Sequence, residues 1–373
     1  MNIDKNMIKF DTGLSIYACK DSSAIRLKEE ENDFRTPFFR DIDRIIYSLS
    51  YTRYLDKTQV FSNNENTNIS KRIIHVQLVS KIARTIGRAI NLNEDLIEAA
   101  SLGHDLGHTP YGHVGESILN KISLENNEGY FNHNIQSVRT LMNIENSGLG
   151  RNITVQVLDA IMCHNGEVPL GIYEPRIKNV SEFLEEYNNS YKDASVIANM
   201  RPMTLEGCVV RISDLIGYLG RDIEDAIRVG IIKKSDIPDN IAKNLGDNNR
   251  EIVNNIVMDI INNSYNKNYI KLSDNIYKSI IELKDFNYKN IYLKANSKED
   301  IEHYESMFRT LFNSYTNDLE NTNLDSPIYK VYLNYKDCSY KDNTNARIVI
   351  DFIAGMTDDY FNLEYKRIAN MKN

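Results

Sequence analysis

Apolar residues recur at the spacing of an α-helix along most of this 373-residue chain. In 72–90 the Ile, Val and Leu positions form one wide stripe, and 38–55 shows the same spacing. Few segments alternate with a period of two, and 289–295 (KNIYLKA) is the best candidate for a strand. The sequence therefore predicts an all-α fold, with room for one short β-hairpin.

Capping and turn residues divide this pattern into helices and loops. Asn93 is a suitable N-cap for a helix that we expect to run to residue 108. Further helices are expected at 114–124, 133–145, 151–164, 204–229, 249–263, 272–284, 298–318 and 345–369. Loops are expected at 62–68, 125–129, 166–175 and 342–345.

The composition is that of a globular protein, with 42% apolar and 26% charged residues. No apolar run is long enough to cross a bilayer, residues 1–11 have no apolar signal core, and the four cysteines form no CxxC pair. We therefore expect a cytoplasmic protein with no membrane partner. The net charge of −8 argues against general nucleic-acid binding, although a local basic cluster could still bind an anion.

Residue usage changes at about residue 230. Beyond this point only one of the seven histidines remains, and Asn, Lys and Tyr become more frequent. We therefore expect a catalytic core at 1–230 and a helical C-terminal lobe at 231–373, packed together as one compact unit.

The histidines are concentrated in one part of the chain. His75 stands on an apolar helix, and the segment SLGHDLGHTPYGH adds His104, Asp105, His108 and His113. Neutral imidazole is the commonest metal ligand in proteins, and an adjacent carboxylate supplies the charge that holds a divalent cation. If the helix continues through this segment, His104 and His108 lie about one turn apart on the same face.

A fourth ligand should be an acid on another helix. Asp214 is the best candidate, because its apolar flanks predict a buried helix and a buried carboxylate needs a cation or a hydrogen-bond partner. Tyr218 and Asp222 follow at i+4 and i+8, so the three side chains should share one face of that helix. Glu116 lies three residues after His113 and can orient it.

Each residue also has a plain structural interpretation. His75 could be a hydrogen-bonded core histidine, Asp214 the partner of a buried arginine, and Tyr218 part of the core. His164, followed by Asn165 and Gly166, is typical of a helix C-terminus, where these residue types serve capping. We therefore leave His164 out of the predicted site.

Taken together, His75, the His104-Asp105 pair and the distant Asp214 resemble the metal-binding pattern of HD-domain phosphohydrolases. The surrounding segments are similar to those of the deoxyguanosine triphosphate triphosphohydrolase family, and the likeness covers nearly the whole chain, weakest from 230 to 340. These segments are RTPFFRDIDRII (35–46), RYLDKTQVF (53–61), SKRIIH (70–75), GHDLGHTPYGHVGE (103–116), FNHNIQS (131–137), IMCHNGE (161–167), TLEGCVVRISDLIGYLGRDIEDAI (204–227) and DFIAGMTD (351–358).

The resemblance implies an HD-domain helical fold that hydrolyses a deoxynucleoside triphosphate, with dGTP favoured, to a deoxynucleoside and inorganic triphosphate. The metal ligands that it implies are His75, His104, Asp105 and Asp214. It implies catalysis by His113, supported by Glu116, with His108 and His133 facing the phosphates. The other substrate-binding residues that it implies are Arg72 for a phosphate, Tyr218 beside the sugar, and Gln59 and Asp222 for the 3′-hydroxyl. Residue chemistry adds Arg53 and Lys57 as cations for a polyphosphate.

Several features stay open at this point. Two histidines and two carboxylates suit Mn, Mg, Fe, Co or Zn. The resemblance suggests a homo-oligomer, either a tetramer or a hexamer. A second dNTP or single-stranded DNA could act as an effector. Another HD hydrolase (a nucleotide phosphodiesterase or phosphatase) and a nucleotide sensor without turnover are the alternatives. Leu215, Arg221 and Tyr54 depart from the family pattern, and Arg221 and Tyr54 leave the base preference and the activator site undecided.

Overall fold

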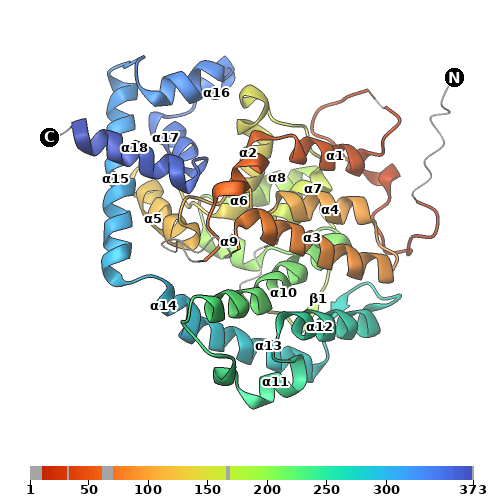
Figure 1. The fold of residues 1–373 in the computed structure, drawn as a ribbon. Helices are drawn as coiled ribbons and strands as arrows, with labels where there is room; N and C mark the ends of the chain where they lie inside the picture. The colour runs from red at the N-terminus through yellow and green to blue at the C-terminus, as the bar shows by residue number, and fades with distance from the viewer. Residues whose placement is uncertain (1–10, 32, 61–69, 165–168, 372–373) are drawn as a thin grey trace.

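The computed structural model describes residues 11–31, 33–60, 70–164 and 169–371. It consists almost entirely of helices, which confirms the predicted all-α fold (Figure 1). The α-helices are α1 (Pro37–Ile46), α2 (Leu49–Thr52), α3 (Arg72–Ala89), α4 (Glu94–Gly103), α5 (Gly112–Glu125), α6 (His133–Arg139), α7 (Val155–Met162), α8 (Val180–Asn189), α9 (Ala194–Asn199), α10 (Leu205–Arg228), α11 (Asp239–Leu245), α12 (Asn249–Ser264), α13 (Asp274–Asn287), α14 (Leu293–Ala295), α15 (Lys298–Glu320), α16 (Cys338–Lys341), α17 (Asn345–Ala354) and α18 (Asp358–Met371). Within the described residues the only strands are β1 (Ile172–Tyr173) and β2 (Ile270–Lys271), which pair antiparallel. They belong to segments far apart in the sequence, so the pair is not a hairpin.

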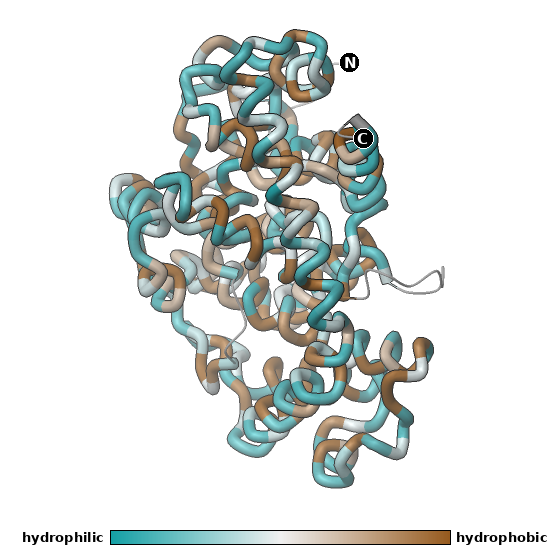
Figure 2. The backbone as a smooth tube through the Cα atoms, turned by 90° about the vertical axis from the view of Figure 1, so that its left-hand side faces the viewer, coloured by the Kyte–Doolittle hydropathy of each residue, from teal (hydrophilic) through white to brown (hydrophobic). Residues whose placement is uncertain are grey.

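The longest helices lie where the apolar spacing predicts them. α3 buries Val76, Val79, Ala83 and Ile86, which recur every three or four residues, and α10 and α15 bury similar stripes. Figure 2 shows apolar (brown) and polar (teal) residues alternating within the helices. The burial of one side of each helix stabilises these elements, because isolated helices are only marginally stable in water.

The strand expected at 289–295 is wrong. α13 continues directly into a π-helical turn at Tyr288–Tyr292, and α14 follows at once. Ile291 is fully buried whereas Leu293 is 60% exposed, so two residues on the same face of the expected strand have opposite environments. The apolar residues of this segment are therefore spaced as in a helix, because α13 continues into it.

Other differences between the expected and the observed elements concern one helix that is divided, one helix that was not predicted, and the loops. The helix expected at 345–369 is divided into α17 and α18 around Gly355. The apolar spacing does not predict α8, although Asn179 and Glu182 form a capping box at its start. The loop expected at 62–68 lies outside the described residues, as do 165–168 at the start of the loop expected at 166–175.

Two apolar cores hold the helices together. The larger contains buried residues of α1, α3, α4, α7 and α10–α13, and the smaller joins α5 to α15, α17 and α18. In Figure 1, α15 (light blue) runs beside α5, whereas α12 and α13 lie against α10 and α11 packs on α12 and α13. The region after residue 230 thus packs on the rest of the molecule in two separate places, and the domain boundary at 230 stays a prediction.

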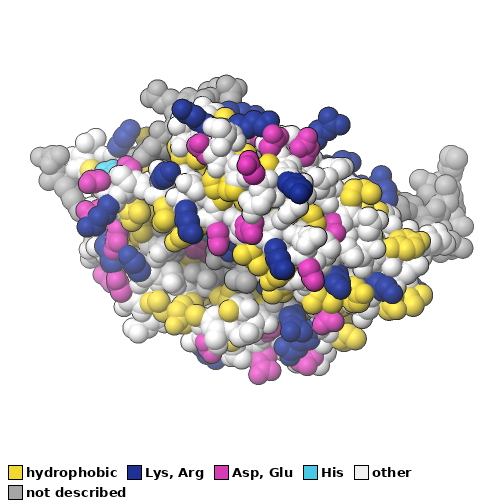
Figure 3. All heavy atoms as spheres, turned by 90° about the horizontal axis from the view of Figure 1, so that it is seen from below, with side chains coloured by type: hydrophobic (Ala, Val, Ile, Leu, Met, Phe, Trp, Pro, Cys, Tyr) yellow, Lys and Arg dark blue, Asp and Glu magenta, His cyan; other side chains and the backbone are white. Residues whose placement is uncertain are grey.

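Across the part of the chain that the structure describes, no helix is both long and apolar enough to cross a membrane. On the face shown in Figure 3, basic (blue) and acidic (magenta) side chains are interspersed with apolar ones. This face therefore has no broad area of a single charge.

Candidate metal centre

The packing of α3 against α10 brings the first two predicted ligands together. His75 lies on the buried side of α3, and Asp214 lies near the middle of α10. α10 approaches closely because residue 217 is glycine: a Cβ on Gly217 would lie 2.8 Å from a methyl carbon of Val79. As a result, His75 Nε2 is 3.0 Å from Asp214 Oδ1.

A turn, and not a continuing helix, presents the next residues. α4 ends at Gly103, so the prediction that His104 and His108 share a helix face is wrong. The chain turns here because it passes very close to α6: a Cβ on Gly107 would lie 2.2 Å from the carbonyl oxygen of His133. The turn still directs His108 toward Asp105, with His108 Nε2 3.3 Å from Asp105 Oδ1.

The four predicted metal ligands lie side by side: the donor atoms of His75, His104 and Asp214 are within 4.8 Å of one another, and Asp105 adjoins them. His104 Nε2 is 3.4 Å from Asp105 Oδ1 and 3.4 Å from Asp214 Oδ1. His75 Nε2 is 3.8 Å from Asp105 Oδ2. Donor atoms bound to one cation at about 2.1 Å lie roughly 3–3.5 Å from one another, so the distances from Asp214 to His75 and His104 fit a single ion, with Asp105 beside it.

The orientation of the His104 ring also fits a cation. Its Nδ1 donates a hydrogen bond to the carbonyl oxygen of Ser101 at 2.7 Å, so Nε2 carries the lone pair of the neutral ring. This buried Nε2 has no hydrogen-bond partner among the described residues, and it faces the carboxylates of Asp105 and Asp214. A lone pair in this position is repelled unless a proton or a metal cation lies between these groups.

The pKa shifts of the buried groups agree with a site for a cation. Burial opposes protonation of His104, but the charges of Asp105 and Asp214 outweigh it and raise the pKa of this histidine to about 9. Burial would raise the pKa of Asp214, but its contacts with His104 and His75 hold that pKa well below the usual range. The site therefore attracts positive charge.

Glu116 organises a second group of predicted residues. Its Oε1 accepts hydrogen bonds from the backbone N of His133 at 2.7 Å and from His133 Nδ1 at 2.9 Å, and its Oε2 accepts one from His113 Nδ1 at 3.1 Å. Burial would raise the pKa of Glu116, but His133 and His113 hold it well below the usual range. The His108 ring stacks on His133 with centroids 3.9 Å apart, so this group adjoins the metal ligands.

His113 is the most accessible histidine of the site, with 63% of its side chain exposed. It follows Tyr111 and Gly112, both of which have left-handed backbone conformations at the start of α5. A ring that is held at Nδ1 by Glu116 and is open to solvent can exchange protons.

Arg72 lies beside the predicted metal ligands, and Gln59 follows Thr58, which Arg72 also contacts. The guanidinium of Arg72 donates to Asp105 Oδ2 and, at 3.0 Å, to the carbonyl oxygen of Thr58. It therefore fixes the orientation of the Asp105 carboxylate. Among the described residues, no group hydrogen-bonds the buried Oε1 of Gln59.

Tyr218 and Asp222 follow Asp214 along α10 as the sequence predicts. Asp222 Oδ2 accepts a hydrogen bond from the hydroxyl of Tyr292 at 2.7 Å. Burial raises the pKa of Asp222 to about 7, so this carboxyl group is partly protonated near neutral pH.

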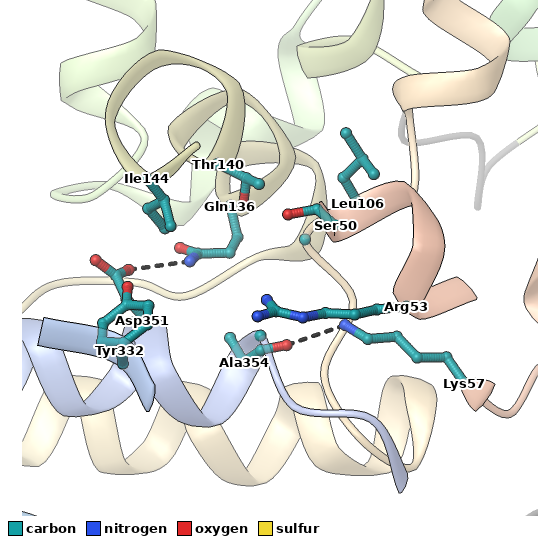
Figure 4. Close-up of a pocket in the computed structure, with 12 residues that line it drawn as sticks. Ser50, Arg53, Lys57, Leu106, Gln136, Thr140, Ile144, Tyr332, Asp351 and Ala354 are labelled. Atoms are coloured by element: carbon teal, nitrogen blue, oxygen red, sulfur yellow. Dashed lines mark hydrogen bonds between the residues drawn. The ribbon is translucent and has the colours of Figure 1, made fainter. Parts of the chain in front are cut away.

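Arg53 and Lys57 belong to a separate cavity, shown in Figure 4. Lys57 Nζ donates to the carbonyl oxygens of His108 and Ala354. Burial, followed by the charges of Arg53 and Arg72, lowers the pKa of Lys57 to about 7. The cavity has a volume of about 10 Å³, enough for one water molecule, and none of the predicted metal ligands lines it.

His164 lies in the site although we left it out of the prediction. Its Nδ1 donates to the carbonyl oxygen of Ile161 at 2.6 Å, which is the capping role that the sequence indicates. The ring is 1% exposed, and its Nε2 is 3.1 Å from His133 Nε2. The concentration of six histidines in 75–164 is the signal that could have included it.

Comparisons with known proteins agree with this geometry. The chain matches the HD domain over residues 72–218 and the phosphohydrolase-associated domain over residues 270–367. It is 37% identical to a deoxyguanosinetriphosphate triphosphohydrolase-like protein of Caldanaerobacter subterraneus subsp. tengcongensis, over 95% of this chain and 92% of the relative. Proteins of the same name are 36% identical in Clostridium perfringens, over 91% and 89%, and 33% identical in Pelagibacter ubique, over 89% and 93%. The chain is therefore a metal-dependent phosphohydrolase, and it belongs to the deoxyguanosinetriphosphate triphosphohydrolase-like family of HD-domain proteins.

Proposed function

We propose that the protein hydrolyses a deoxynucleoside triphosphate, with dGTP favoured, to a deoxynucleoside and inorganic triphosphate. One observation carries this proposal: the predicted metal ligands and the His113–Glu116 pair form one connected cluster. His108 links the two groups, because its ring is 3.3 Å from Asp105 and stacks on His133. The names of the relatives support the choice of substrate.

In the proposed reaction the oxygen of water bonds to the α-phosphorus, and the bond between that phosphorus and the 5′-oxygen breaks. The 5′-oxygen leaves with a proton, and the water gives up a proton to the site or to solvent. A divalent cation held by His75, His104, Asp105 and Asp214 would supply polarisation of a phosphoryl oxygen.

We assign proton transfer to His113. Glu116 holds the Nδ1 of this ring, and Nε2 on the other side of the ring would take or give a proton at the reacting oxygen. Because Glu116 stays ionised, it stabilises the protonated form of His113. His108 and His133, stacked beside it, would face the phosphates.

The remaining predicted residues would bind the rest of the substrate. Arg72 would hold a phosphate while keeping its contact with Asp105, and Tyr218 would lie beside the sugar. Gln59 and Asp222 would bond the 3′-hydroxyl, for which the unpartnered Oε1 of Gln59 and the buried carboxyl group of Asp222 provide polar groups.

Arg53 and Lys57 stay predictions for phosphate binding. Their small cavity would have to open to admit a phosphate, and Lys57 already donates to two backbone carbonyls.

Chromatographic product analysis tests this function. The purified protein with Mn²⁺ or Mg²⁺ is incubated with the four dNTPs, singly and in pairs. Release of inorganic triphosphate supports the proposal, whereas orthophosphate or a nucleoside monophosphate supports another HD hydrolase. Activity that appears only in pairs identifies a dNTP effector.

Single substitutions test the ligand assignment. His104→Ala and Asp105→Ala should each abolish both metal binding and turnover. The exposed His303, far from the site in sequence, provides the matched control: His303→Ala should keep both. Turnover that persists in the His104→Ala variant would contradict the proposed metal set. Light scattering after gel filtration tests the proposed tetramer or hexamer.

A further inference from the structure

Arg53 and Lys57 bring two cationic groups into one small cavity (Figure 4). Arg53 begins the 3-10 turn that follows α2, and Lys57 comes directly after that turn. Their side chains line the cavity together with residues of α6 and the end of α17. Besides burial, the charge of Arg53 lowers the pKa of Lys57, so the packing holds two groups of like charge beside each other.

The guanidinium of Arg53 has no counter-charge in the described part of the chain. No oxygen there accepts a hydrogen bond from it, and no carboxylate forms an ion pair with it. Burial lowers the pKa of Arg53 more than the charge of Glu145 raises it. Because an arginine stays protonated in proteins, this partly buried charge costs free energy unless an opposite charge lies beside it.

The carboxylates around the cavity are paired with other groups. Asp351, which lines the cavity, has its Oδ2 2.8 Å from a guanidinium nitrogen of Arg139. Glu145 has its Oε2 2.8 Å from a guanidinium nitrogen of Arg151. Neither acid therefore neutralises Arg53.

The end of α17 holds both cations in place. A Cβ on Gly355 would lie 2.9 Å from Arg53 Nη1, so the guanidinium lies where the absence of a side chain allows it. Lys57 Nζ donates to the carbonyl oxygen of Ala354 at 3.0 Å and to that of His108. A protonated lysine has three N–H donors, so one N–H of Lys57 remains for a further acceptor.

We propose that this cavity binds one monatomic inorganic anion, such as chloride, between Arg53 and Lys57. The volume of about 10 Å³ holds about one water molecule, so the cavity suits a single small ion and excludes a phosphate group. A water molecule could accept the hydrogen bonds but would not offset the charge of Arg53. The hydroxyl of Thr140, which also lines the cavity, can donate a hydrogen bond to the anion.

The anion would support the turn that carries His108. Lys57 donates to carbonyl oxygens of that turn and of α17, so its ammonium group joins two segments that are distant in the sequence. A negative charge beside Lys57 favours the charged form of the amine and thereby this link. The proposal does not depend on which nucleotide the protein hydrolyses.

Anomalous diffraction locates the anion directly. Crystals of the full-length protein are grown in sodium bromide and measured at the bromine absorption edge. A peak within hydrogen-bond distance of the Arg53 guanidinium and of Lys57 Nζ is expected. Arg53→Gln should lose this peak. The exposed Arg250 on α12 provides the matched control, and Arg250→Gln should keep the peak.

Thermal unfolding tests the same site in solution. Chloride replaces gluconate at constant ionic strength and in the presence of EDTA, since gluconate is too large for the cavity. An ion that binds only the native state stabilises it, so Tm should rise with chloride in the wild type and in Arg250→Gln. In Arg53→Gln, Tm should not respond to chloride.

A further variant keeps the test decisive if Arg53→Gln does not fold. Gly355→Ala keeps every charged group but places a methyl group where the guanidinium lies, so it should need more chloride for the same rise in Tm. The absence of a bromide peak in the wild type would overturn the proposal in favour of a water molecule. An equal response to chloride in Arg53→Gln would overturn it as a general salt effect. A rise in Tm with inorganic phosphate but not with chloride would overturn it in favour of a phosphate group.

Discussion

At the scale of single residues, the site depends most on Glu116, which holds two histidine rings with one carboxylate. Glu116→Gln would replace one acceptor oxygen by an amide that only donates, so either His113 or His133 would lose its partner. We expect kcat to fall by about a hundredfold or more, because correctly placed acid–base groups contribute 10²–10⁴. Bound metal should be unchanged.

The control for Glu116→Gln is the exposed Glu185 on α8. Glu185→Gln should leave kcat at the wild-type value. If Glu116→Gln also has wild-type kcat, then Glu116 does not orient the acid–base histidine.

Glu206 provides a prediction on stability. Its Oε1 accepts hydrogen bonds from the backbone N atoms of Cys19 and Asn93, at 2.9 and 3.1 Å, and no basic side chain in the described part of the chain pairs with it. Burial raises the pKa of Glu206 from 4.5 to about 7. The native state therefore binds this proton more tightly than the unfolded chain does. The resulting stabilisation is complete below about pH 4.5 and is lost as the pH rises through about 7.

Glu206→Gln keeps an acceptor and removes the titration. Relative to wild type, its free energy of unfolding should be higher at pH 8 than at pH 5 by about 3 kcal/mol. Urea unfolding followed by circular dichroism at the two pH values measures this difference. Glu185→Gln should show no such dependence, and a pH-independent effect of Glu206→Gln would show that Glu206 titrates normally.

His164 is a residue whose place in the site could not be predicted from the sequence. The capping interpretation was correct for Nδ1, and it left no reason to ask where Nε2 points. His75, His104, Asp105 and Asp214 could be grouped from their types and flanking residues, but the distances between them depend on packing that only the structure shows.

At the scale of elements, the junction of α17 and α18 holds two segments of the site. Asp358 accepts hydrogen bonds from the backbone N atoms of Thr58 at 3.0 Å and Tyr111 at 3.2 Å. These segments continue to Gln59 and to His113. Asp358→Asn turns one acceptor into a donor, which leaves a buried N–H without a partner and should cost about 1–3 kcal/mol of stability.

We expect Asp358→Asn to raise KM for the nucleotide, since Gln59 would lose its fixed position, with bound metal unchanged. The neighbouring Asp359 is exposed, and Asp359→Asn should leave KM and stability at wild-type values. An unchanged KM in Asp358→Asn would show that the junction supports the fold alone.

Helix ends were harder to predict than helices. The apolar stripes of α3, α10 and α15 could be read directly, because one side of each helix is buried. The end of α4 at Gly103 could not be read, because it follows from the close passage of Gly107 against α6. The π-helical turn at Tyr288–Tyr292 continues from α13, and nothing in its local pattern separates it from a strand.

At the scale of the whole molecule, the predicted metal ligands come from α3, α10 and the turn after α4, which all meet only in the folded chain. A cation that binds the native state alone should stabilise it by about 2.7 kcal/mol at a concentration one hundred times its dissociation constant. Differential scanning calorimetry should therefore show a higher Tm with Mn²⁺ than with EDTA.

His104→Ala should remove most of this rise in Tm, and His303→Ala should retain it. An equal Tm with Mn²⁺ and with EDTA in the wild type would mean that the converging carboxylates and imidazoles bind no ion under these conditions.

The two groups of site residues lie on helices of different apolar cores. The proposed metal ligands His75 and Asp214 lie on helices of the larger core, whereas α5, which carries His113 and Glu116, packs into the smaller one. A displacement of about 1 Å between the two cores would misalign the proposed proton donor and the proposed ion site enough to slow the proposed reaction roughly a hundredfold. We therefore expect that a substitution which shifts the contact between the two cores changes the rate of the proposed reaction while leaving every participating group intact.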